Sequence, residues 1–239
     1  MAVLKAIGSG SSGNGYAIET DNEILLLEAG CRAKEVKEAI NFQVSKVVGM
    51  FITHSHMDHC EYVRQYMNSG FSIYTNDETQ EFIETKYGEK VTGIPEMKAI
   101  QVGKFKVTGF YLPHNGTPCF GYYIEHPEIG RMVFLTDFEL CEWNFQGKKL
   151  NHIFIEANYS NDLIDYSFAN ARHVLLGHCE LETSLGFIES NVTDSLKNVV
   201  LLHLSDRNSD EKEFCSAVQS IVGPVVNVAI AGKGKEIKL

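Results

Sequence analysis

Residues 54–59, His54-Ser55-His56-Met57-Asp58-His59, place three imidazoles and a carboxylate within six positions. They directly follow an almost continuous apolar run at 46–53, which predicts a buried strand. Neutral imidazole nitrogens and carboxylate oxygens suit Zn²⁺, Mn²⁺ or Fe²⁺ as ligands. Because alternate residues of an extended loop face the same way, His54 and His56 are expected to bind one ion, with Asp58 and His59 facing a second position. The stretch therefore predicts a metal centre on a strand-to-helix loop.

An alternative interpretation gives the same stretch a structural role. The histidines would then cap the following helix, with Asp58 as its N-cap or first-turn acid. Three histidines and an acid in six residues rarely meet by chance in a chain that holds nine histidines. The metal interpretation is therefore favoured.

The composition is that of an ordinary globular protein, with 44% hydrophobic and 22% charged residues among 239. The sequence holds no long proline, serine or charged run that would form a linker, so one domain spanning 1–239 is expected. The formal net charge of -10 argues against a broad basic surface for duplex nucleic acid. Bound cations would supply local positive charge, so a smaller phosphate ligand remains compatible with this balance.

The six cysteines contain no CxxC pair, which predicts free thiols in a reducing compartment. The first eight residues form too short an apolar run for a signal peptide, and no apolar stretch reaches membrane-spanning length. A cytoplasmic protein without a membrane partner is therefore expected.

Strand-like runs bounded by Gly or Pro alternate with helix-like segments along the whole chain. Strands are expected at 3–7, 16–19, 24–28, 46–53, 71–74, 105–112, 121–125, 131–136, 153–156, 199–204 and 225–229. Helices are expected at 33–41, 61–68, 77–87 and 211–221, and 162–197 is expected to be mostly helical. Strands with interspersed helices in both halves predict two sheets covered by helices, a four-layer α/β fold.

The histidine stretch resembles the HxHxDH motif of metallo-β-lactamase fold hydrolases. That family adds, from successive strand ends, a lone His, an Asp that bridges two metals, and a final His. This chain offers Pro113-His114-Asn115, Leu135-Thr136-Asp137 and Leu202-His203-Leu204 in that order. Taken singly, His114 is equally typical of a loop histidine, and Asp137 of a helix N-cap before Phe138.

The resemblance implies a single-domain αββα metallo-β-lactamase-like sandwich with seven metal ligands. The first metal would be held by His54, His56 and His114, and the second by Asp58, His59 and His203, with Asp137 as the bridge. The implied cofactors are two divalent ions, Zn or Mn, with Fe as an alternative.

Two further stretches resemble the YycJ-type (WalJ-type) branch of the family: Gly8-Ser9-Gly10-Ser11-Ser12-Gly13-Asn14 and His203-Leu204-Ser205-Asp206-Arg207-Asn208. Backbone N–H groups of the first would line the rim where an anionic substrate group enters, although a mobile hairpin turn is the alternative. In the second, Arg207 is expected to clamp a phosphate.

One position departs from the family pattern. Glu28-Ala29-Gly30 stands where the family usually has Asp-Ala-Gly, so Glu28 is expected to support the histidine loop. His178, in Gly177-His178-Cys179, is expected to contact substrate or donate a proton to the leaving group, with a core histidine at a helix start as the alternative. The other histidines fit no set and are expected to be surface or structural residues: His126, His152 and His173.

The implied mechanism is hydrolysis by hydroxide that two cations generate near neutral pH, with Asp58 orienting it. The resemblance favours a phosphodiesterase or nuclease, with nucleic acid as first substrate and small nucleotides, including cyclic ones, close behind. A thioesterase or lactonase is a further alternative and would need an apolar pocket beside the metals. A non-enzyme alternative is a metal-stabilised binding or regulatory protein. A homodimer is left open.

Overall fold

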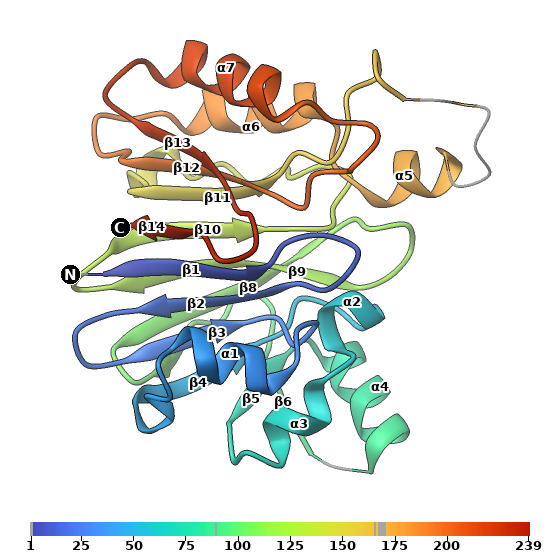
Figure 1. The fold of residues 1–239 in the computed structure, drawn as a ribbon, viewed down its shortest axis with the longest axis vertical. Coiled ribbons are helices and arrows are strands. Elements are labelled where there is room, and N and C mark those ends of the chain that lie inside the picture. The colour runs from blue at the N-terminus through green and yellow to red at the C-terminus, as the bar shows by residue number, and fades with distance from the viewer. Residues whose placement is uncertain (1, 89, 165, 167–170) are drawn as a thin grey trace.

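Two seven-stranded sheets lie face to face, and helices cover their outer sides (Figure 1). The computed structural model describes residues 2–88, 90–164, 166 and 171–239. The first sheet has the order β14 (Glu236–Lys238), β1 (Val3–Gly8), β2 (Gly15–Glu19), β3 (Ile24–Leu27), β4 (Val47–Phe51), β5 (Ile73–Thr75), β6 (Thr92–Gly93). The second has the order β13 (Asn227–Ile230), β12 (Asn198–Leu202), β11 (His152–Glu156), β10 (Gly130–Leu135), β9 (Cys119–His126), β8 (Phe105–Leu112), β7 (Ile100–Val102).

The helices form the two outer layers. The first sheet is covered by α1 (Ala33–Ala39), α3 (Val63–Met67) and α4 (Asp77–Tyr87), and the short α2 (Met57–Cys60) lies at its edge. The second sheet is covered by α6 (Leu181–Asn191) and α7 (Glu211–Val222), and α5 (Ala171–Gly177) lies beside them. Short 3₁₀ turns lie at Val44–Lys46 and Gln146–Lys148. The predicted four-layer αββα sandwich is confirmed.

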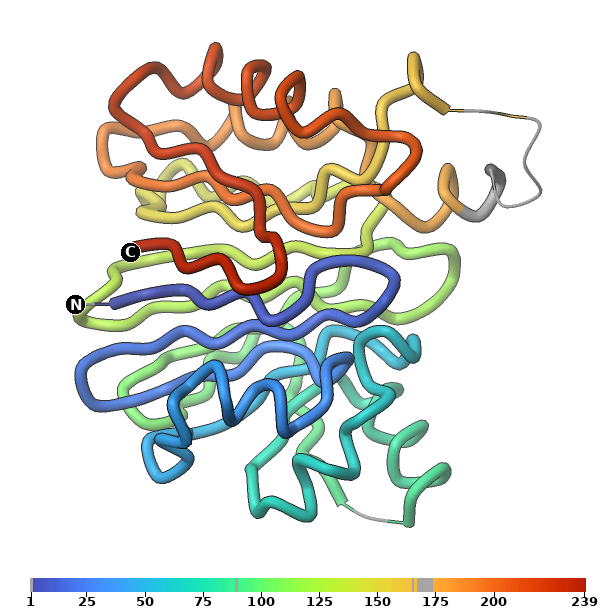
Figure 2. Tube along the Cα trace, in the orientation of Figure 1, coloured from blue at the N-terminus to red at the C-terminus, as the bar shows by residue number. Residues whose placement is uncertain are grey.

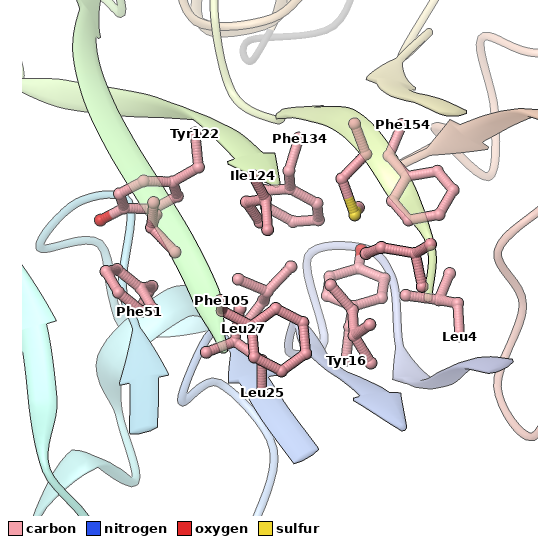
Figure 3. Packing of buried hydrophobic residues seen from close by; sticks show 14 of the residues in the cluster. Leu4, Tyr16, Leu25, Leu27, Phe51, Phe105, Tyr122, Ile124, Phe134 and Phe154 are labelled. Atoms are coloured by element: carbon pink, nitrogen blue, oxygen red, sulfur yellow. The ribbon is translucent and has the colours of Figure 1, made fainter. Parts of the chain in front are cut away.

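The main core fills the space between the sheets. Figure 3 shows Tyr16 and Phe51 of the first sheet, which pack edge-on against Phe134 and Tyr122 of the second, respectively. Strand β3 explains why both sides of a sheet are apolar: Leu25 and Leu27 enter this core, while Ile24 and Leu26 pack under the outer helices. All four side chains are fully buried, which is typical of strands covered on both faces. Each such side chain contributes about 1.5–3 kcal/mol to folding.

The strand directions place loops from both sheets along one edge of the sandwich. Strands β3, β4, β5 and β6 run parallel, and so do β10, β11, β12 and β13. Their carboxyl ends therefore meet at a common edge, where ligand sites of such sheets form. The two chain ends lie side by side in Figure 2, because β1 pairs with β14 in antiparallel fashion from Val3 with Lys238.

The structure departs from the expected elements in two ways. The short edge strands β6, β7 and β14 were not predicted, because two or three residues carry too little periodicity. The helix expected at 61–68 is α3, and the separate short helix α2 before it was not predicted. The backbone of Ala29 separates the two helices, since its N–H donates to His59 O and its carbonyl accepts from Tyr62 N. These bonds replace helical ones at the junction.

The region expected to be mostly helical, 162–197, contains α5 and α6. Residues 165 and 167–170 of that prediction lie outside the described residues. All six cysteines are free thiols, as predicted. Among the described residues, the longest helices are too short or too polar to cross a bilayer.

His152 and His126 are buried structural residues rather than surface ones. His152 Nε2 donates to Ile129 O at 3.0 Å, and its Nδ1 accepts from the Asn198 amide at 2.9 Å. Burial lowers the pKa of His152 to about 4. In mild acid the folded chain therefore keeps this imidazole neutral, whereas the same imidazole in the unfolded chain is protonated. The side chain of His173, which was grouped with these two, lies outside the described part of the structure.

We expect this histidine to weaken the fold in mild acid. As the pH falls from 6.5 toward 4, the unfolded chain takes up a proton that the folded chain refuses. The free energy of unfolding should then drop by about 3 kcal/mol through His152 alone. Urea unfolding of the wild type and His152→Gln at pH 7.5 and 4.5 tests this, since the variant should lose correspondingly less stability. Equal losses in the two proteins would contradict the prediction.

Candidate metal centre

Side chains from five strand ends converge at the common edge of the sandwich. His54 lies three residues beyond β4, His114 two beyond β8, and Asp137 two beyond β10, while His203 directly follows β12 and Glu156 ends β11. Asp137 and His203 have left-handed backbones with φ of 52° and 51°. Residues other than glycine rarely adopt this conformation, and its cost of about 1–3 kcal/mol is typical of functional sites.

The first cluster contains His54, His56, His114 and Asp137, whose ligand atoms lie within 4.8 Å of one another. His114 Nε2 is 3.0 Å from His56 Nδ1, and His54 Nε2 is 3.9 Å from Asp137 Oδ2. The outer nitrogens of two rings are fixed: His54 Nδ1 contacts Thr53 Oγ1 at 2.9 Å, and His114 Nδ1 contacts the Gly177 carbonyl. Such contacts orient the opposite nitrogens toward a shared centre.

The second cluster contains Asp58, His59, Asp137 and His203, again within 4.8 Å. His59 Nε2 lies 3.4 Å from Asp58 Oδ2 and 3.3 Å from Asp137 Oδ2. His203 Nε2 lies 3.5 Å from Asp58 Oδ2. Asp137 belongs to both clusters, so its carboxylate lies between them.

Glu28 supports this second cluster, as the sequence led us to expect. Its buried carboxylate lies 3.3 Å from His59 Nδ1 and accepts from the backbone N–H of Thr53. The left-handed backbone of Glu28, with φ of 65°, turns the chain out of β3 at this point. Gly30 follows where any Cβ would meet Asp58 O at 1.7 Å. The Glu-Ala-Gly stretch thus lies directly against the histidine loop.

Glu156 is the site residue that the sequence analysis missed. Its Oε1 lies 2.7 Å from His178 Nδ1 and 3.0 Å from His203 Nδ1. Its Oε2 accepts from the backbone N–H groups of Phe138 and Cys179, each at 3.2 Å. The sequence carries a signal for Glu156, because this acid closes an expected apolar strand. Asp137 has a similar place, directly after another expected strand. Asp137, Glu156, His178 and His203 form a third cluster of ligand-type atoms.

The donor set fits divalent cations. His54 Nε2 and His203 Nε2 are buried and have no hydrogen-bond partner within the described part of the chain. An unsatisfied buried nitrogen costs about 1–3 kcal/mol, so two of them directed at carboxylates need an explanation. Imidazole and carboxylate ligands with outer hydrogen-bond partners are the usual surroundings of Zn²⁺ or Mn²⁺. A bound cation would satisfy both nitrogens.

The electrostatics of the two clusters differ. Burial lowers the pKa of His114 to about 4 and holds the pKa of His54 well below its usual value. Burial acts in the same direction on His203, but the Asp137 charge and the adjacent Asp58 and Glu156 carboxylates outweigh it and raise the pKa to about 10. The carboxylates around His203 stabilise its protonated imidazole, and the same negative charges would attract a metal cation.

A pocket of about 440 Å³ opens onto these clusters. Its floor includes His56, Asp58, Asp137 and His203, together with His178. The rim comprises Ser9, Gly10, Ser11 and Ser12 on one side and Leu204, Ser205, Asp206 and Arg207 on the other, with Asn158 and Val174 completing the wall. Polar groups therefore dominate the lining. Both stretches singled out in the sequence, at 8–14 and 203–208, contribute to this rim.

The structure brings together all seven sequence-predicted ligand positions and His178. His178 lies between α5 and α6, not at a helix start, and contacts Glu156. The alternative of Asp137 as a helix N-cap is wrong, because residues 138–145 form an irregular segment and the next helical turn begins only at Gln146. Ser9 also bridges the rim, since its Oγ accepts from Tyr16 OH and from His203 N.

Comparison with known proteins gives relatives over most of the chain. It is 26% identical over 239 residues to a protein named exodeoxyribonuclease YycJ of Bacillus anthracis, covering 90% of this chain and 88% of the relative. It is 28% identical over 225 residues to exodeoxyribonuclease WalJ of Streptococcus pneumoniae strain D39, covering 85% and 81%.

Solved structures with the same fold include the metallo-beta-lactamase fold protein YhfI from Bacillus subtilis, with a TM-score of 0.76, 16% identity and 100% of both chains covered. The short form of human tRNase Z superposes with a TM-score of 0.65 and 17% identity over 99% of this chain and 98% of the other. The family model described as the beta-lactamase superfamily domain matches residues 30–185, more than half of the sequence. The chain therefore belongs to the beta-lactamase superfamily, in its metallo-β-lactamase fold.

Proposed function

We propose that this protein is a metal-dependent phosphodiesterase that hydrolyses DNA, with two divalent cations at its active site. The observation that carries the proposal is the convergence of two ligand clusters on Asp137 at the floor of an open pocket. The first cation would be held by His54, His56 and His114, the second by Asp58, His59 and His203, with Asp137 shared. Zn²⁺ and Mn²⁺ are the ions that this ligand chemistry favours, with Fe²⁺ next.

Cations held at these positions would lower the pKa of water toward about 7 and so supply hydroxide near neutral pH. Asp58 lines the pocket wall beside His203, and we assign it the role of orienting the attacking water. His178 also lines the pocket, and Glu156 fixes its ring through Nδ1. This placement suits His178 for donating a proton to the leaving oxygen. The Ser and Arg side chains at the rim are hydrogen-bond donors that suit a substrate phosphate and would fix its position.

The lining favours a phosphodiester over a thioester or lactone. Only Val174 and Leu204 are apolar among the lining residues, whereas those substrates need an apolar pocket. The names of the relatives from Bacillus anthracis and Streptococcus pneumoniae, both exodeoxyribonucleases, support DNA as the first substrate to test. The six free thiols are consistent with the reducing cytosol as the compartment. A homodimer stays a prediction, which sedimentation would test.

Elemental analysis followed by an assay panel tests the proposed function. The panel contains single-stranded DNA, RNA, cyclic nucleotides and a thioester, each with and without chelator. We expect metal in the purified protein and chelator-sensitive cleavage of DNA. A protein that retains its metals but turns over none of these substrates would support the binding or regulatory alternative instead.

His56→Ala should reduce turnover without unfolding the protein. His56 lies only partly buried at the pocket and belongs to the first cluster alone. Losing one ligand should lower kcat/KM for DNA by roughly 100-fold, or about 2.7 kcal/mol. Met57→Ala is the matched control, because it truncates the neighbouring exposed side chain in the same loop. Circular dichroism should show both variants folded, and equal turnover in the two would argue against His56 as a ligand.

A further inference from the structure

A second groove of about 200 Å³ lies on the outer face of β8 and β9, away from the metal clusters. Its walls include Phe110 and Tyr123 of these strands and Trp143, Phe145 and Lys148 of the segment that follows β10. Pockets that enclose whole small molecules usually measure about 300–1,000 Å³. The size of this groove, which we name the Trp143 groove, therefore suits one planar group of a larger ligand.

The aromatic rings of the Trp143 groove are held in place from beneath. Tyr123 and Phe145 stack with centroids 5.7 Å apart and planes 16° apart, and Phe145 also packs against Phe187 of α6 at 6.3 Å. Phe110 supports Trp143 at 6.1 Å in an edge arrangement. Trp143 is nevertheless 40% exposed, which is a large apolar area for the sole tryptophan of the chain. A fixed aromatic ring exposed to solvent suits stacking by a flat partner.

Cations surround these rings although the whole chain carries a net charge of -10. Lys148 Nζ lies 6.0 Å from the centroid of the Tyr123 ring, and Lys148 forms no ion pair within the described residues. Lys106 also lines the groove and pairs with Glu125 at 3.1 Å. The Arg131 guanidinium donates to the Lys148 carbonyl and so adds a further cation nearby. Trp143 is the exposed ring of this groove, and an exposed aromatic ring beside cations is a feature of single-strand nucleic-acid binding sites.

The Trp143 groove is connected to the metal clusters by a short segment. Trp143 follows Asp137 by six residues, which span at most roughly 20 Å of chain. Glu139 ties this segment to the His114 loop, because its N–H donates to Pro113 O and its carboxylate accepts from Asn115 N. At about 3.4 Å per nucleotide, a strand of at most about six nucleotides covers that distance.

We propose that the Trp143 groove binds a base of a single-stranded nucleic acid whose scissile phosphodiester lies at the metal clusters. This inference rests on the proposed function, and it identifies the substrate as a strand several nucleotides long rather than a cyclic nucleotide. Base stacking on Trp143 holds the strand, and Lys148 neutralises a neighbouring phosphate.

The fluorescence of Trp143 provides a direct test, because the chain has no other tryptophan. The metal-bound protein is titrated with a phosphorothioate oligothymidylate of ten nucleotides, which resists hydrolysis. We expect saturable quenching, which weakens as salt rises. Thymidine monophosphate and inorganic phosphate should leave the fluorescence unchanged, because they reach the metal clusters but do not span to the groove. Absence of quenching at oligonucleotide concentrations that inhibit cleavage would overturn the proposal.

Variants separate stacking from charge. Lys148→Glu keeps the fluorophore and should weaken oligonucleotide binding by about tenfold. Lys212→Glu is the control, because it makes the same charge change on α7, beside the opposite edge of the sheet. This control should not weaken oligonucleotide binding. Trp143→Ala should raise KM for the oligonucleotide by about tenfold with little change in kcat, and Trp143→Phe should restore most of the loss. Equal effects of the two lysine variants would overturn the proposal.

The outcomes also distinguish this inference from the proposed function. Quenching by the oligonucleotide without hydrolysis of any phosphodiester would contradict the proposed activity but support the groove as a strand-binding site. Cleavage of DNA with unchanged KM in Trp143→Ala would support the proposed activity and contradict the groove as a strand-binding site. A fluorescence change with protein concentration alone would show a second copy of the chain covering the groove, and would overturn the proposal.

Discussion

Asp137→Asn is expected to remove most of the bound metal and to lower kcat/KM for DNA by about 10³-fold or more. Asp137 is common to all three clusters of ligand-type atoms, and its two oxygens lie 3.3 Å from His59 Nε2 and 3.5 Å from His203 Nδ1. An amide has nearly the same shape but lacks the negative charge that binds cations. A 10³-fold loss corresponds to about 4 kcal/mol, which is the several kcal/mol that metal ions supply in hydrolysis.

Metal content per chain and steady-state kinetics, measured on the same preparations, check this expectation. Asp194→Asn is the matched control, since Asp194 is exposed in the turn after α6 and makes the same chemical change far from the clusters. The control should keep both its metals and its turnover. Full metal content and wild-type turnover in Asp137→Asn would exclude a shared carboxylate at this position.

Glu156→Gln is expected to have the largest effect on stability. The buried carboxylate accepts from two backbone N–H groups through one oxygen and contacts His178 and His203 through the other. Burial and the Asp137 charge raise the pKa of Glu156, but the His178 charge and the His178 and His203 hydrogen bonds outweigh them and hold it below its usual value. Glutamine removes the charge and places an N–H₂ donor either against the two backbone N–H donors or against the two ring nitrogens. Breaking such a buried pair costs about 3 kcal/mol of unfolding free energy.

Urea unfolding in the presence of chelator measures this loss without a contribution from bound metal. Glu189→Gln, at an exposed position on α6, should leave the free energy of unfolding within about 0.5 kcal/mol of the wild type. Because Glu156 also orients two histidines of the site, kcat should fall by about 10- to 100-fold in the metal-loaded variant. A Glu156→Gln protein with unchanged stability would contradict the pairing seen here.

Much of the fold was predictable because the strands and helices carry strong local signals. The runs ending at Phe51, Leu135 and Leu202 are almost wholly apolar, which predicts strands buried on both faces. Those signals fail for β14, whose three residues acquire their strand conformation only by pairing with β1. They also fail at the junction between α2 and α3, where Ala29, distant in sequence, takes the backbone hydrogen bonds.

The sequence by itself determined the histidine stretch at 54–59, because ligands within six residues must lie close together whatever the rest of the chain does. The order of His114, Asp137 and His203 added the remaining positions by resemblance. Only the tertiary structure revealed Glu156 and the Trp143 groove. The acid that closes the run at 153–156 marks Glu156 as polar, but its partners lie in separate elements, and a contact between residues far apart in the chain leaves no periodic or local pattern in the sequence. Such contacts form when burial of the apolar strand faces brings the strand ends to one edge.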